Sequence, residues 1–130
     1  MRQRNLQLDD YGISCWRYKQ LYALCRQYPE KRKILASVRE LDALADDGLP
    51  HGNGTSDPTA RKADKALQLR EDIALIEDTA REVDPANWTA LIRNVTEGVP
   101  YEYLQVYCGR RQFYESRRKF FWILDRREKG

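Results

Sequence analysis

Several residue types that carry chemistry are scarce in this chain of 130 residues. There is one histidine, His51, and the three cysteines, Cys15, Cys25 and Cys108, form no Cys-x-x-Cys pair. We therefore expect neither a disulfide framework nor a Cys/His zinc site. No acids, serines or cysteines are spaced as a catalytic site requires, so we expect no enzyme, no metal ion and no cofactor.

Long apolar runs are missing as well. No stretch approaches the length of about 18 apolar residues that a membrane-spanning helix needs, and the mean hydropathy is -0.79. The first ten residues contain no apolar segment of the kind found in secretory signal peptides. We therefore expect a soluble protein that stays in the cytoplasm and makes no contact with a membrane.

Strand-like patterns are also absent, and helical patterns take their place. No stretch longer than four residues alternates between apolar and polar side chains, as a half-buried strand would. Apolar residues instead recur three and four positions apart, which is the spacing of one helical face. The sequence predicts an all-α protein.

Two helices are predicted near the N-terminus. Ser14 is a suitable N-cap for a helix from Cys15 to about Tyr28, and Pro29 ends that helix and opens the next, from about Glu30 to Ala45. A segment rich in Gly, Pro, Asn and Asp follows at 46–57 and predicts a mobile loop. The residues expected to face inward are Tyr18, Leu21, Cys25 and Tyr28 in the first helix, and Ile34, Val38, Leu41 and Ala45 in the second.

The next helix has a clear start signal and a heptad seam. Asp57 is the expected N-cap and Pro58 the first helical residue. A seam of this kind must pack on another helix, either the preceding helix as an antiparallel hairpin or a second copy of the chain. We therefore predict that residues 1–83 form a helical hairpin or coiled-coil region for oligomerisation, as in a homodimer, or for partner binding. The seam residues are Ala66, Leu69, Ile73, Ile76, Ala80 and Val83.

Two further helices are predicted before the last one. Asp84 and Pro85 repeat the start signal and open a helix that Gly98 ends. Pro100 then opens a short helix that runs to about Val106. The residues of the longer helix expected on its buried face are Trp88, Leu91, Ile92 and Val95.

The last predicted helix runs from Arg110 to about Arg126, after a break at Gly109. This layout, with two helices separated by stops and a final helix, is typical of a helix-turn-helix, so we assign residues 84–130 to a DNA-binding region. Its inward-facing residues are expected to be Phe113, Phe120, Phe121 and Leu124.

Basic charge is concentrated in the same segment. The chain carries a net charge of +3, but residues 99–130 alone hold eight basic and four acidic side chains, whereas residues 57–98 hold six and nine. A local basic cluster suits double-stranded DNA as a partner better than the small overall charge does.

The start of the last helix supplies the residues that we predict contact DNA. Arginine can bond O6 and N7 of guanine together, and glutamine can do the same at N6 and N7 of adenine. Helical geometry places positions 110, 111, 114, 115 and 118 opposite the inward face, so their side chains are expected to point outward. The predicted base-reading residues are Arg110, Arg111, Gln112 and Tyr114. The predicted phosphate-anchoring residues are Arg117, Arg118 and Lys119.

The segments Gly-Val-Pro-Tyr-Glu-Tyr-Leu (98–104) and Cys-Gly-Arg-Arg-Gln-Phe-Tyr-Glu-Ser-Arg-Arg-Lys-Phe-Phe (108–121) resemble small prophage proteins of the ArpU/RinA type. The resemblance covers roughly residues 50–125. It implies a late-gene transcriptional regulator whose C-terminal helix-turn-helix is similar to that of sigma factors. The connection before the last helix is about two residues shorter than in the sigma-like pattern, and Gly109 stands where serine or threonine is the usual cap.

Two other functions use the same sequence features. Aromatic residues are dense in and before the first helix, and exposed aromatics favour protein interfaces, so a small interaction adaptor, or contact with RNA polymerase, is one alternative. A DNA-packaging-related DNA-binding subunit is the other. The aromatic residues concerned are Tyr11, Trp16, Tyr18, Tyr22 and Tyr28.

Overall fold

The computed structural model of the protein describes residues 12–45 and 56–129, and these residues contain no β-strand. The predicted all-α class is confirmed. The elements are α2 (Cys15–Arg26), α3 (Tyr28–Ala45), α4 (Ser56–Val83), α5 (Trp88–Glu97), the 3-10 turn η1 (Tyr101–Tyr103) and α6 (Arg110–Lys129). Most of the predicted loop, residues 46–55, lies outside the described residues.

The first two helices follow the local signals in the sequence. The Ser14 hydroxyl accepts a hydrogen bond from the Arg17 backbone N–H at 3.1 Å, which confirms Ser14 as the N-cap of α2. The chain turns at Gln27 and resumes as α3, with Pro29 in the first turn where its missing N–H is tolerated. The predicted break at Pro29 is therefore confirmed to within two residues.

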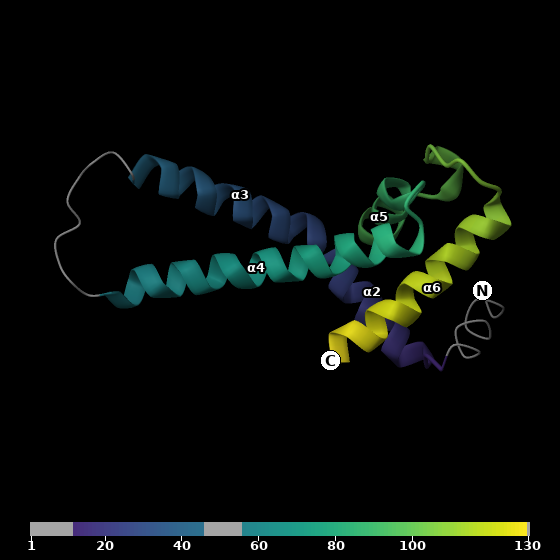
Figure 1. Ribbon diagram of the computed structural model, residues 1–130, viewed down its shortest axis with the longest axis horizontal. Helices are drawn as coiled ribbons and strands as arrows, with labels where there is room; N and C mark the ends of the chain where they lie inside the picture. Colours follow the sequence, from purple (N-terminus) through teal and green to yellow (C-terminus); the bar gives the residue numbers. More distant parts are fainter. Residues whose placement is uncertain (1–11, 46–55, 130) are drawn as a thin grey trace.

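Helices α3 and α4 form a hairpin that extends from the globular end of the molecule (Figure 1). Leu35 of α3 is buried against Ala66 and Leu69 of α4, and the ammonium of Lys31 pairs with Asp72 at 3.0 Å. The first part of the heptad seam thus packs on the preceding helix of the same chain, whereas Ile76 and Ala80 belong to the main core.

The predicted inward face of α3 is confirmed at Val38, which packs against the hairpin cluster, and is wrong at Ile34 and Leu41. Leu35 is 8% exposed, whereas its neighbour Ile34 is 37% exposed and Leu41 is 61% exposed. The reason is that α3 buries Tyr28 and Leu35, seven residues apart, toward α4, which leaves Ile34 and Leu41 on the flank. Ala45, the last of the four predicted residues, has a side chain outside the described part of the structure.

The main core joins residues from both ends of the chain. Phe113, Phe120, Phe121 and Leu124 of α6 are all fully buried, so the predicted inward face of this helix is confirmed. They pack with residues of α2, α4 and α5. The predicted regions 1–83 and 84–130 share this core, and their division at Asp84 stays a prediction. The other core residues are Ile13, Leu21, Cys25, Tyr28, Ile76, Ala80, Ala90, Leu91, Ile92 and Val95.

Three predicted helix boundaries are wrong. Helix α4 begins at Ser56, so Asp57 is a helical residue and not the N-cap. Helix α5 starts at Trp88 rather than at Pro85, because the Asp84 carboxylate accepts hydrogen bonds from the Asn87 backbone N–H and side-chain amide at 3.2 Å and closes a turn. The short helix predicted from Pro100 to Val106 is only the three-residue turn η1, because Leu104 is extended (φ −106°, ψ 149°) and ends it. The stop at Gly98 is confirmed, since this residue adopts φ 73°.

None of the helices in the described residues is both long enough and apolar enough to cross a membrane.

Candidate nucleic-acid interface

The first turn of α6 is anchored in the core on one side and exposed on the other. The Phe113 N–H bonds to the Gly109 carbonyl oxygen at 3.0 Å, which closes the first turn of the helix. Phe113 itself is fully buried and holds one side of that turn in the core. Arg110, Arg111 and Gln112 are exposed on the rest of the turn. The structure therefore brings together three of the four predicted base-reading residues at one helix end.

Arg110 is held by three neighbours. Its guanidinium forms an ion pair with Glu102 of η1 and lies 5.8 Å from the ring centroid of Tyr101 and 5.5 Å from that of Tyr114. The hydrogen bond with Glu102 raises the pKa of Arg110, and the same bond lowers the pKa of Glu102. The charge of Arg110 is thus compensated within the protein, while its position is fixed.

The exposed face of α6 differs from the predicted one. Tyr114 is half-buried and meets Phe113 edge to face, with ring centroids 5.6 Å apart. The side chain of Arg118 is only 18% exposed and pairs with Glu115. The prediction that Tyr114 and Arg118 point outward is wrong, because buried Phe121 lies seven and three positions after them and therefore on the same side of the helix.

The outward face carries Arg111, as predicted, and four side chains that were not predicted there. No ion pair with another described residue is found for Arg111 or Lys119, so their charges are not neutralised there. Further along, the guanidinium of Arg126 lies 4.9 Å from the ring centroid of Trp122. The outward residues are Arg111, Gln112, Lys119, Trp122 and Arg126.

Arg117 is built into the fold. Its Nε donates to the Asn94 side-chain oxygen at 2.7 Å and its Nη2 to the Tyr18 hydroxyl at 2.9 Å. The guanidinium also lies 5.0 Å from the ring centroid of Phe121. This arginine joins α6 to α2 and α5, so its predicted contact with phosphate stays a prediction and the geometry does not favour it.

The loop before α6 exposes two tyrosines that the sequence analysis did not single out. Tyr103 is 78% exposed and Tyr107 is 73% exposed. Their backbone is nevertheless held: the side-chain oxygen of buried Asn87 accepts a hydrogen bond from the Tyr107 N–H at 2.7 Å, and the Tyr101 hydroxyl donates to the Cys108 carbonyl oxygen at 2.9 Å. The only sequence signal was the density of tyrosine between Pro100 and Gly109.

Two of the cations at the far end of α6 form ion pairs within the fold. Arg127 pairs with Glu82 at 2.7 Å and Lys129 with Asp125 at 3.4 Å. Asp125 also accepts the Nε of Arg17 at 2.5 Å, which ties the start of α2 to the end of α6. The ion pairs of Arg127 with α4 and of Asp125 with α2 therefore hold helices together at this end, whereas Arg111 and Lys119 form no ion pair with another described residue.

The aromatic residues of the first helix mostly belong to the core. Tyr28 is buried, and Tyr18 and Tyr22 pack against the core cluster. Trp16 is the exception, because it is 74% exposed and its ring lies under the ammonium of Lys19 at 4.3 Å. Tyr11 lies outside the described residues.

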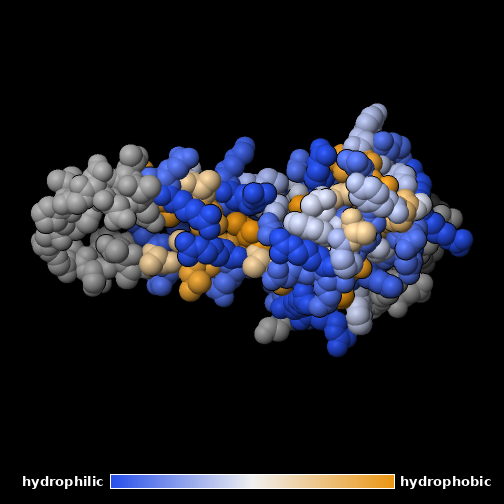
Figure 2. Space-filling model, turned by 45° about the horizontal axis from the view of Figure 1, so that its top comes forward, coloured by the Kyte–Doolittle hydropathy of each residue, from blue (hydrophilic) through white to orange (hydrophobic). Residues whose placement is uncertain are grey.

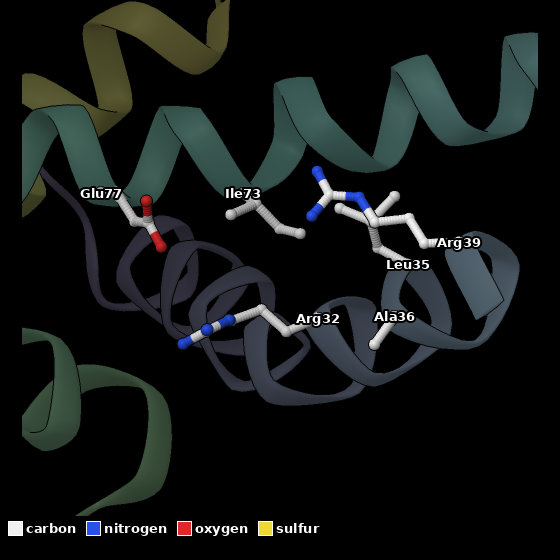
Figure 3. A pocket seen from close by; sticks show the side chains of 6 residues that line it. All are labelled: Arg32, Leu35, Ala36, Arg39, Ile73 and Glu77. Atoms are coloured by element: carbon white, nitrogen blue, oxygen red, sulfur yellow. The ribbon is translucent and has the colours of Figure 1, made fainter. Parts of the chain in front are cut away.

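The hairpin carries a separate groove. A cavity of about 260 Å³ lies between α3 and α4, with Arg32 and Arg39 on one side and Glu77 on the other (Figure 3). The Glu77 carboxylate accepts a hydrogen bond from the Tyr28 hydroxyl at 2.5 Å, and burial together with this bond raises the pKa of Tyr28 to about 12.

Figure 2 shows apolar residues on the hairpin and a largely hydrophilic globular end on the face in view.

Within residues 12–45 and 56–129, no group of three or more His, Cys, Asp and Glu side chains could hold a metal ion. A scan against protein-family models finds no match to the chain, and searches of curated proteins and of solved structures find none either.

Proposed function

We propose that this protein is a sequence-specific regulator of transcription that binds double-stranded DNA with the first turns of α6. One observation carries the proposal: Arg110, Arg111 and Gln112 are exposed on a helix turn whose other side is fixed by Phe113. A rigid helix end with exposed arginine and glutamine is what major-groove recognition uses.

The residues take different roles in this proposal. Arg111 and Gln112 read base edges, because their side chains leave the protein at the start of the helix. Lys119, two turns later on the outward face, binds a phosphate. Arg110 also lies at the DNA but is oriented by Glu102. We leave Arg117 out of the contact set because its guanidinium is used inside the fold.

The resemblance to ArpU/RinA-type phage proteins supports the same function and gives it a setting. We propose that the protein acts on late genes in the cytoplasm of a bacterial host, where RNA polymerase is the natural protein partner of such a regulator.

Selection from a random library of duplex DNA tests the proposal. We expect the bound duplexes to share a motif containing guanine or adenine at the positions that Arg111 and Gln112 reach. A motif with two-fold symmetry would indicate that a homodimer binds. Bound duplexes without a common motif would contradict sequence-specific regulation and favour the packaging-related subunit.

Substitutions then test the site. Arg111→Ala should weaken binding to the selected motif by about 1–3 kcal/mol and relax the preference at one position. Lys119→Ala should weaken all sequences alike and reduce the slope of log K against log salt by about 0.9. The matched controls are Arg70→Ala and Lys62→Ala on α4, which remove the same charges from exposed positions remote from α6. Equal affinities for site and control variants would refute the assignment.

An interaction adaptor is the second candidate, and the exposure of Trp16 is the observation in its favour. An adaptor would leave the mobility of random DNA unshifted at low salt. It would bind purified bacterial RNA polymerase, and the Trp16→Ala substitution would abolish this binding.

A further inference from the structure

The loop between η1 and α6 presents Tyr103 and Tyr107 to solvent on a backbone that is fixed at several points. Tyr103 is 78% and Tyr107 73% exposed, which with Trp16 at 74% makes them the three most exposed of the large hydrophobic residues in the described part of the chain. Aromatic residues are enriched at the surfaces that proteins use to bind partners, and two such rings stand here on one short loop. An ordered backbone also reduces the entropy lost when such side chains are immobilised on a partner.

Hydrogen bonds hold this loop along its length. The Tyr103 N–H donates to the Pro100 carbonyl oxygen and the Leu104 N–H to that of Tyr101, both at 3.0 Å. The buried amide of Asn87 then holds Tyr107, and the Tyr101 hydroxyl holds Cys108. The backbone that carries the two exposed rings is thus held at Tyr103 by a backbone hydrogen bond and at Tyr107 by the buried side chain of Asn87.

The loop lies beside the proposed DNA-contacting turn. Figure 1 shows η1 and the start of α6 at the end of the molecule away from the hairpin. The ion pair between Glu102 and Arg110 joins the loop to the first turn of α6 directly. If Arg111 enters the major groove of a duplex, one of the phosphate backbones that border this groove would therefore lie against the loop.

The charge of the loop decides which kind of contact it can make. Its only ionised side chain between Tyr101 and Gly109 is Glu102, and that carboxylate is neutralised by Arg110. Electrostatic attraction to phosphate is therefore not available, whereas tyrosine hydroxyls are neutral donors that bond phosphate oxygens in protein–DNA complexes.

Resting on the DNA-binding function proposed above, we infer that Tyr103 and Tyr107 form a second DNA contact, in which their hydroxyls donate to phosphates flanking the groove that α6 enters. The contact is independent of sequence and fixes how α6 is oriented in the groove. Asn87 is the positioning residue for this contact, since it touches the loop and not the DNA.

The test measures the affinity of the full chain for a random-sequence duplex and for the selected motif over a range of salt concentrations. Tyr103→Phe and Tyr107→Phe should each weaken binding to both duplexes by roughly ten- to a hundredfold, the loss of one hydrogen bond to a charged acceptor. The salt slope should not change, because a neutral hydroxyl releases no counterion. Trp16→Ala is the control for loss of an exposed aromatic ring, since α2 brings Trp16 to the opposite end of α6.

The outcomes separate this inference from the proposed function. Unchanged affinity in both phenylalanine variants, together with weakened binding by Arg111→Ala and Lys119→Ala, would overturn the loop contact and leave the DNA-binding function standing. Affinity that survives Tyr→Phe but falls in Tyr→Ala would overturn the hydroxyl contact, since only the ring would then matter. Failure of all these variants to change binding would overturn both proposals.

Discussion

Replacing Asn87 with alanine should remove the support of the loop before α6. The side chain of Asn87 is 4% exposed. Its oxygen accepts the Tyr107 N–H at 2.7 Å, and its nitrogen donates to Asp84 at 3.2 Å and to the Cys108 sulfur at 3.5 Å. Alanine leaves a part-buried backbone N–H without a partner and removes the contacts to Asp84.

The magnitude follows from these contacts. An unsatisfied buried donor costs about 1–3 kcal/mol, so we expect the free energy of unfolding to fall by about 2 kcal/mol. For a chain of this size that corresponds to a decrease in Tm of roughly 6–10 °C. Urea unfolding followed by circular dichroism measures the first quantity and a thermal scan the second. Hydrogen exchange at the Tyr107 amide should become faster at the same time.

The control variant is Gln105→Ala, which removes an exposed amide from the same loop and should change stability by less than about 0.5 kcal/mol. Equal stability of the Asn87 and Gln105 variants, with unchanged exchange at the Tyr107 amide, would refute the role of Asn87.

Three further predictions concern stability and reactivity. Arg117→Ala should lower the free energy of unfolding by about 2 kcal/mol, since it leaves the half-buried partners on α2 and α5 unpaired, whereas Arg111→Ala should leave urea unfolding unchanged. Burial raises the pKa of Asp125, but the bonds from Arg17 and Lys129 outweigh it and the net pKa is lowered. The associated stability is present above the unfolded pKa of about 4 and is lost as pH falls through the folded pKa. Asp125→Asn should therefore flatten the acid limb of the stability profile, which unfolding at a series of pH values measures. Burial raises the pKa of Cys25 to about 12, so a thiol reagent at neutral pH should modify this cysteine only after unfolding, as mass spectrometry of labelled peptides would show.

Features that depend on a few neighbouring residues could be predicted from the sequence. The Ser14 cap, the break at Pro29 and the stop at Gly98 each follow from the conformation of a single residue type. The inward face of α6 could also be predicted, because four large apolar residues left only one side of the helix to bury.

Features that depend on contacts between residues far apart in the sequence could not be predicted. Whether Ile34 or Leu35 faces inward depends on where α4 lies across the hairpin, and both choices fit a helical stripe. Arg117 looked like a phosphate ligand because its partner Tyr18 is 99 positions away. The α5 boundary was misplaced because the turn closed by Asp84 competes with the helix start that an Asp-Pro pair usually provides.

Helix α4 has a mechanical consequence. It contains 28 residues, which corresponds to about 42 Å of continuous helix, and it packs on α3 in the hairpin and on α5 and α6 in the core. After Pro58, in its first turn, it contains neither glycine nor proline, the residues at which helices usually kink. Helix α4 therefore fixes the distance between the hairpin and the core. A partner that binds the hairpin is held at a set distance from the start of α6. If two chains associate through their hairpins, the length of α4 sets the separation between their two α6 helices.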